Sequence, residues 1–200
     1  MIRVVIFDFA GVVASDEADL WTYTYSAVVK KTDLSKNELS RMLSKHWPNM
    51  RLGKYSLDIL WKEIKEKSKK PISIQELRKG LYDSLTIDQR VVNLIKGLKR
   101  KRIRVILLSN ETKQGITNKI KKFHLRELFD QIYCSAYLGM AKPDPSLFFN
   151  VLKRNKLQPN EVVFIDDQRH IVEGAKKLGI PSILYKKFHQ FKKQLYHYII

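Results

Sequence analysis

Short runs of apolar residues recur along the chain, and each is apolar at consecutive positions rather than at alternate ones. Such runs are typical of parallel strands that are buried on both faces of a sheet. Between them, apolar residues return every three to four positions, which predicts amphipathic helices that cover the sheet. We therefore expect an α/β fold, a doubly wound (Rossmann-like) parallel sheet. The predicted strands are residues 4–7, 103–108, 162–165 and 182–185, with a weaker candidate at 131–134, and the predicted helices between them are 88–101, 112–124, 144–155 and 171–178.

One stretch breaks this alternation. Residues 15–85 contain no convincing strand, and about 70 residues are too many for a simple crossover between two strands. Serine followed three positions later by glutamate, at Ser35 and at Ser73, forms a capping box that starts a helix. We expect an inserted helical cap at 15–85 and a core domain made of 1–14 and 86–200. The predicted cap helices are residues 16–31, 35–46, 56–69 and 73–85, with a loop at 47–53.

The last residues of the chain place aromatic and aliphatic side chains on one helical face, from Phe188 to Tyr198. Such a stripe usually packs on a protein core. A helix that lies on a membrane surface is the alternative, because Lys192 and Lys193 fall opposite the apolar face.

The composition favours a protein of the cytoplasm. A hydrophobic content of 44% is enough for a packed core. No apolar run is long enough to cross a membrane, and the N-terminus lacks a signal-peptide pattern. Cys134 is the only cysteine, so no internal disulfide can form.

The net charge of +18 predicts that the protein attracts anions. Phosphorylated metabolites, nucleic acid and acidic membranes are all candidates. The basic residues are spread over several clusters, however, and charge runs alone specify little. A nucleic-acid partner is therefore possible but is not favoured over ordinary solvated helix faces.

Polar side chains follow three of the predicted strands at the point where each strand ends. In an open parallel sheet the carboxyl ends of the strands form the ligand-binding edge. Adjacent carboxylates there repel one another and need a cation or a proton, and three carboxylates make an oxygen-rich site suited to Mg²⁺. The residues in question are Asp8 after the first strand, Ser109 and Asn110 after the second, Asp166 and Asp167 after the fourth, and Lys142 on a loop after the weaker third strand.

These motifs, in this order, resemble those of the haloacid dehalogenase-like superfamily, whose members are mostly phosphatases. The helical insertion after the first motif is similar to the cap of the subclass (C1) that carries it there, and small sugar-phosphate phosphatases are the most similar members. The four matching motifs are residues 8–13 (DFAGVV), 107–110 (LLSN), 142–145 (KPDP) and 164–167 (FIDD).

The resemblance implies a hydrolase that acts on a small phosphorylated substrate. Asp8 would attack phosphorus and form an aspartyl-phosphate. Ser109 and Asn110 would donate hydrogen bonds to the phosphoryl oxygens, and Lys142 would balance the charge of the transition state. The implied ligands of Mg²⁺ are Asp8, the backbone carbonyl of Ala10, Asp166 and Asp167.

Two positions depart from the family pattern. Many relatives carry an aspartate at position 10, which protonates the leaving oxygen and later activates water, and Ala10 can do neither. Many also carry an asparagine at the position of Ile171, next to His170, for which a helix start is the simpler interpretation.

Three interpretations of Ala10 are open. The chain is a phosphatase that uses another group for proton transfer, or it is a catalytically weak relative that binds nucleic acid or another polyanion. The third is hydrolysis of a carbon–phosphorus bond, because phosphonoacetaldehyde hydrolases resemble this chain in having alanine there. Those enzymes form a Schiff base on a cap lysine, and Lys45 and Lys54 flank the cap loop here.

Overall fold

A five-stranded parallel sheet forms the centre of the protein in the computed structural model, which describes residues 1–14, 28–83 and 85–199. The strand order is β3-β2-β1-β4-β5, so β1 lies in the middle and pairs with both β2 and β4. The predicted doubly wound fold is confirmed, including the weaker third strand. The strands are β1 (Val4–Phe7), β2 (Arg104–Ser109), β3 (Gln131–Cys134), β4 (Val162–Asp166) and β5 (Ser182–Leu184).

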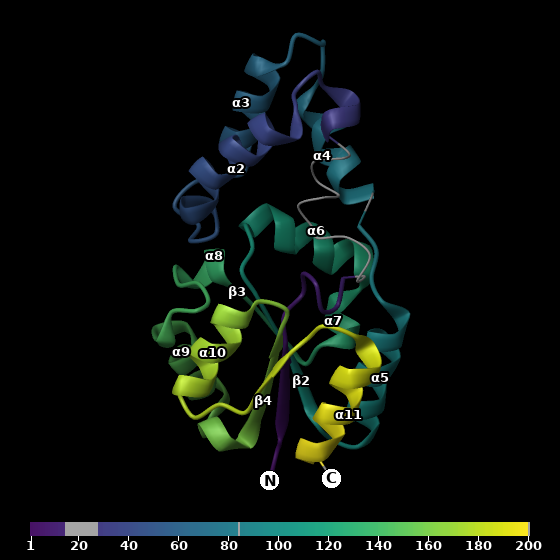
Figure 1. The fold of residues 1–200 in the computed structure, drawn as a ribbon, viewed down its shortest axis with the longest axis vertical. Helices are drawn as coiled ribbons and strands as arrows, with labels where there is room; N and C mark the ends of the chain where they lie inside the picture. Colours follow the sequence, from purple (N-terminus) through teal and green to yellow (C-terminus); the bar gives the residue numbers. More distant parts are fainter. Residues whose placement is uncertain (15–27, 84, 200) are drawn as a thin grey trace.

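Helices cover both faces of this sheet, which explains why its strands are apolar at consecutive positions. On one face, α5 (Gln89–Arg100) and α11 (Phe188–Ile199) pack on the sheet, and on the other face lie α9 (Pro145–Asn155) and α10 (Arg169–Lys177) (Figure 1). The remaining elements of the core are α6 (Lys113–Phe123), α7 (Leu125–Leu128), α8 (Ser135–Leu138) and the 3₁₀ turn η1 (Pro159–Glu161).

The C-terminal stripe packs on the protein core, as predicted, although not along its whole length. Phe191 and Leu195 are buried in the cluster that α5 shares with the sheet, whereas Tyr198 is 40% exposed. Among the described residues, no helix is long and apolar enough to span a membrane.

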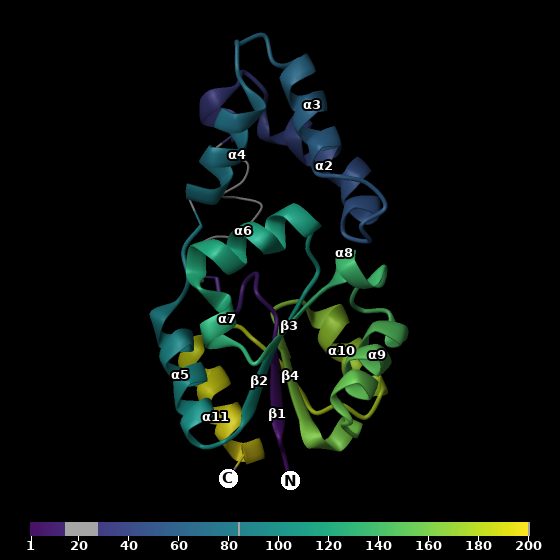
Figure 2. The same ribbon diagram turned by 180° about the vertical axis from the view of Figure 1, so that it is seen from behind.

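Three helices of the insertion form a separate layer beyond the carboxyl ends of the strands (Figures 1 and 2). They are α2 (Lys36–Met50), α3 (Asp58–Lys67) and α4 (Ile74–Asp83), and they enclose an apolar cluster of their own around Trp61. Both predicted capping boxes are present, at Ser35 and at Ser73. The helix predicted at 16–31 falls largely outside the described residues.

The loop predicted at 47–53 is wrong for its first half, because α2 continues through Pro48 to Met50. Met50 is fully buried in the cluster of the insertion, and Trp47 packs against the same cluster. This burial holds the last turn of α2 together although Pro48 lacks an N–H to donate.

The insertion is joined to the rest of the protein by two adjacent chain crossings and by polar contacts. Ala14 and Ile87 form an isolated antiparallel bridge, so the two crossings lie side by side. On the opposite side, the hydroxyl of Ser135, in α8, donates a hydrogen bond of 2.6 Å to the backbone oxygen of Arg51. The insertion thus lies over the carboxyl edge of the sheet, where the polar residues were predicted. The exact boundaries at 14/15 and 85/86 stay predictions.

Candidate active site

The carboxyl ends of β1, β2 and β4 bring the predicted site residues to one edge of the sheet. Asp8 directly follows β1, and its backbone N–H donates to the oxygen of Ile165 in β4 at 2.9 Å. Asp166 is the last residue of β4, and Ser109 is the last residue of β2. The parallel register therefore does what the sequence predicted: it places side chains that are far apart in the chain side by side.

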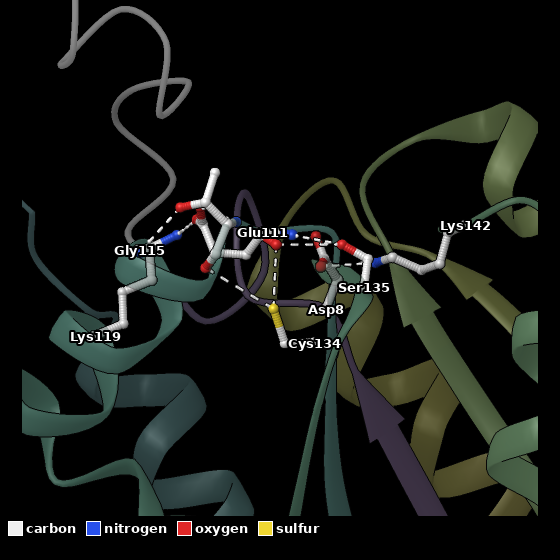
Figure 3. A network of polar contacts seen from close by, with 8 residues as sticks. Asp8, Glu111, Gly115, Lys119, Cys134, Ser135 and Lys142 are labelled. Atoms are coloured by element: carbon white, nitrogen blue, oxygen red, sulfur yellow. Dashed lines mark hydrogen bonds and ion pairs between the residues drawn. The ribbon is translucent and has the colours of Figure 1, made fainter. Parts of the chain in front are cut away.

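Lys142 joins two of these carboxylates. Its ammonium donates to Asp8 Oδ1 and to Asp166 Oδ2, both at 2.7 Å, and all three side chains are buried (Figure 3 shows the contact to Asp8). The other oxygen of Asp166 accepts from the backbone N–H of Gln168 at 2.9 Å. Burial alone would lower the pKa of Lys142, but the charges of Asp8 and Asp166 outweigh it and raise that pKa above its ordinary value.

Three carboxylates crowd together beside this lysine. Asp8, Asp166 and Asp167 each offer an oxygen, and these oxygens lie within 4.8 Å of one another. Burial raises the pKa of Asp8 to about 6, with a further contribution from the charge of Asp166 and against the opposing effect of Lys142. The pKa of Asp167 rises to about 7, first because the surrounding protein reduces its hydration and then through Asp8 and Asp166. One lysine does not neutralise this cluster, so it retains a preference for a further cation or a proton.

A glycine lets the first of these loops approach the last. Gly11 has a φ of +68°, and a Cβ at this position would lie 2.3 Å from Asp167 Oδ2. Only a residue without a side chain allows the segment after Asp8 to pass this close to Asp167.

Asn110 fixes the position of Lys142 rather than facing the cavity with a free amide. Its Oδ1 accepts from the backbone N–H of Lys142 at 2.8 Å, and its Nδ2 donates to the backbone oxygen of Lys142 at 2.9 Å. This reciprocal pair ties the end of β2 to the loop that carries the lysine. The side chain of Asn110 is therefore occupied in this structure.

A cavity of about 440 Å³ opens between this edge and the insertion. Asp8, Ala10, Asn110 and Lys142 line it, whereas Ser109, Asp166 and Asp167 do not. From the insertion, α2 and the residue after it contribute Ser40, Leu43, Ser44, Trp47 and Arg51, and the core adds Glu111, Lys119, Gln168, His170 and Ile171. Neither Lys45 nor Lys54 lines the cavity, and Lys45 is instead paired with Glu63 at 3.0 Å on the surface of the insertion.

Two cavity residues were missed by the sequence analysis, namely Glu111 and Lys119. They form an ion pair and are both buried (Figure 3). A signal for Lys119 was present: it falls on the apolar stripe of α6, three residues after Ile116 and four before Phe123. A lysine on a buried stripe needs a partner, and the sequence does not say which one. His170 lies exposed in the first turn of α10, as the simpler interpretation predicted.

A doubly wound sheet with an aspartate after its first strand, a buried lysine bonded to it and an acidic pair after the fourth strand defines a class of hydrolase with a covering helical insertion. The comparison with protein families agrees. Residues 5–185 match the model of the haloacid dehalogenase-like hydrolases. The chain belongs to this family, as its motifs predicted.

Relatives of known name include two phosphatases. The chain is 26% identical to a D-ribitol-5-phosphate phosphatase of Bacteroides thetaiotaomicron over 91% of each chain. It is also 26% identical to the sesquiterpene phosphatase astK of Aspergillus oryzae, over 90% of this chain and 88% of that one. A match of 28% identity to the drimenol cyclase drtB of Aspergillus calidoustus covers 98% of this chain but only 36% of the cyclase.

The fold is shared with solved structures of the same family. The crystal structure of the family enzyme bt-2542 from Bacteroides thetaiotaomicron superposes with a TM-score of 0.79 at 23% identity, over 92% of this chain and 94% of that one. At this identity the likeness concerns the fold, including the helical insertion.

Proposed function

We propose that this protein is a Mg²⁺-dependent phosphomonoesterase that acts on a small phosphorylated metabolite through an aspartyl-phosphate at Asp8. One observation carries the proposal: the Lys142 ammonium lies 2.7 Å from Asp8 Oδ1 at the floor of a cavity beneath the insertion. A buried carboxylate that is held by a lysine and faces a cavity is suited to attack on an anionic electrophile. Two relatives along nearly the whole chain are named as phosphatases, which supports the same chemistry.

The carboxylate cluster fits a divalent cation. Asp8, Asp166 and Asp167 supply hard oxygen ligands within 4.8 Å of one another, and the raised pKa values of Asp8 and Asp167 show that their charges are poorly compensated. In the proposal, these side chains and the backbone oxygen of Ala10 hold Mg²⁺. When bound, the cation offsets the repulsion between the nucleophile and the phosphate. A structure of the family enzyme bt-2542 contains magnesium and inorganic phosphate, which agrees with this assignment.

The chain's own residues then have separate tasks. Asp8 forms a bond to phosphorus as the bond to the leaving oxygen breaks, and Lys142 balances the charge on the phosphoryl group. Ser109 and Asn110 are the proposed donors to the phosphoryl oxygens. Because the amide of Asn110 is bonded to Lys142, we assign its contact to the backbone N–H.

The cavity favours a small substrate with a mixed surface. Its volume of about 440 Å³ is that of a small-molecule site. Arg51 offers it a positive charge, whereas Leu43 and Trp47 offer apolar surface. The relatives named for a sugar-alcohol phosphate and for a sesquiterpene span the same range, so both kinds of alcohol belong in a substrate screen.

The test is phosphate release from sugar, nucleotide, acyl, isoprenoid and aryl phosphates, with Mg²⁺ and with EDTA. We expect turnover that depends on Mg²⁺ and is abolished by Asp8→Asn. Asp33→Asn is the matched control, since it makes the same change on an exposed residue of the insertion. Circular dichroism must show that Asp8→Asn is folded.

Unchanged turnover by Asp8→Asn would contradict the proposal. An absence of turnover on every phosphate, together with salt-dependent retention on DNA or RNA, would favour the polyanion-binding alternative instead.

A further inference from the structure

Removal of an alkoxide from phosphate needs a proton, and the first loop of the site provides none. Ala10 lines the cavity but carries no titratable group. Lys142 is already bonded to Asp8 and Asp166, and Arg51 does not give up its proton in proteins. Among the described residues that line the cavity, this leaves Glu111, Lys119 and His170 as carriers of a transferable proton.

Lys119 lies closest to the vacant function. It is only 3% exposed, yet it belongs to the lining of the cavity together with Asp8 and Ala10. Its ammonium sits 4.7 Å from the centre of the Phe9 ring. Because Phe9 stands between Asp8 and Ala10 in the chain, this contact places the ammonium against the loop that carries the nucleophile.

Glu111 holds this ammonium in place. One carboxylate oxygen of Glu111 pairs with Lys119, and the other accepts from the backbone N–H of Thr112 at 2.8 Å and from its hydroxyl at 3.2 Å. Thr112 is itself fixed as the N-cap of α6, where it accepts from the N–H of Gly115 at 3.0 Å. Lys119 and Glu111 thus meet at a defined position at the start of α6.

Such a pair is expensive to bury. Removing two charges from water costs several kcal/mol per ion, and a pair of apolar side chains of similar volume would often serve stability as well. The packing of α6 therefore does not explain why a lysine occupies its apolar stripe, whereas a task inside the cavity does.

We propose that Lys119, oriented by Glu111, is the general acid and base of the reaction and takes over the task that Ala10 cannot perform. The inference rests on the proposed function. As the bond from Asp8 to phosphorus forms, the electron pair of the breaking P–O bond goes to the leaving oxygen, which takes a proton from Lys119 Nζ. The neutral amine then accepts a proton from the water that attacks the aspartyl-phosphate, and the Asp8 carboxylate is released with inorganic phosphate.

This assignment predicts which substrates suffer when Lys119 is changed. Alkyl phosphates have poor leaving groups and need the proton, whereas an acyl or nitroaryl phosphate does not. We expect Lys119→Met to lower kcat/KM for alkyl phosphates by about 10²-fold or more, the usual effect of losing a general acid, and to change formation of the intermediate from acetyl phosphate much less. Lys121→Met is the matched control, because Lys121 is an exposed lysine of the same helix.

Lys119→Arg guards against misfolding and against a role in binding alone. Arginine keeps the positive charge next to Glu111 but stays protonated. The proposal predicts that Lys119→Arg is folded and shows the same selective loss on alkyl phosphates. Equal losses on alkyl and acyl substrates, or full activity of Lys119→Arg, would overturn it, because either result assigns Lys119 to charge alone.

A second readout follows the covalent intermediate. With acetyl phosphate, Lys119→Met should form the aspartyl-phosphate at Asp8 but hydrolyse it slowly, so the phosphorylated protein accumulates and is detected by mass spectrometry. Introducing Ala10→Asp into Lys119→Met should restore turnover of alkyl phosphates. Absence of both accumulation and rescue overturns the inference, as does the selective loss in His170→Gln rather than in Lys119→Met. Failure of the proposed function has a different signature, namely turnover that survives Asp8→Asn.

Discussion

The carboxylate of Asp8 should make the metal-free protein less stable as the pH rises. Its pKa is raised from 3.8 to about 6 in the folded state. One pKa unit corresponds to about 1.36 kcal/mol, so ionising Asp8 costs the folded state about 3 kcal/mol more than the unfolded state. Below pH 3.8 Asp8 is protonated in both states, and this contribution to stability is fully present. It is lost as the pH rises through about 6, because the unfolded state releases its proton first.

The substitution Asp8→Asn isolates this contribution, since an amide of the same shape does not titrate. We expect the free energy of unfolding of the wild type to fall, relative to that of Asp8→Asn, by about 3 kcal/mol between about pH 4 and pH 7. The pKa of Asp167 adds to the fall, because the charge of Asp8 helps to raise it. Comparing the two proteins cancels the carboxylates whose pKa values are lowered elsewhere, such as Glu63.

The assay is urea unfolding in EDTA, followed by far-UV circular dichroism. Tryptophan fluorescence alone would mislead, because Trp21, Trp47 and Trp61 all belong to the predicted cap and report on it. A difference between the two proteins that is constant with pH, or that grows in favour of the wild type, would refute the reasoning. Adding Mg²⁺ near neutral pH should stabilise the wild type in proportion to the logarithm of its concentration above the dissociation constant, and Asp8→Asn far less.

Three further substitutions test the surroundings of the site. Gly11→Ala forces a side chain into the left-handed region and toward Asp167, so we expect a loss of about 1–2 kcal/mol together with weaker Mg²⁺ binding by calorimetry; unchanged binding would contradict the close approach. Ser135→Ala removes the hydrogen bond to the backbone oxygen of Arg51 and should cost about 1 kcal/mol of insertion–core contact, measured as faster proteolysis within the insertion, and an unchanged rate would count against this contact. Trp61→Ala should cost about 3–5 kcal/mol within the insertion and melt it before the sheet; a single coincident transition would show that the two parts unfold together.

Much of the fold follows from local patterns. The five strands were predicted within about one residue, because burial on both faces leaves runs of consecutive apolar residues, as in Val4 to Phe7. The capping boxes at Ser35 and Ser73 were predicted because their partners lie three residues away. The end of α2 was wrong, since Met50 is helical owing to a cluster formed with α3 and α4, which no local pattern reveals.

By itself, the sequence determined the sheet, the family and the edge at which Asp8, Lys142 and the acidic pair meet. These are properties of strand ends and motifs, and parallel pairing translates them directly into proximity. Only the tertiary structure decided how the site is completed. It commits the amide of Asn110 to Lys142 and brings Lys119 from α6 against Phe9. Both contacts join residues that are far apart in sequence, through side chains whose partners depend on how helices and loops pack on the sheet.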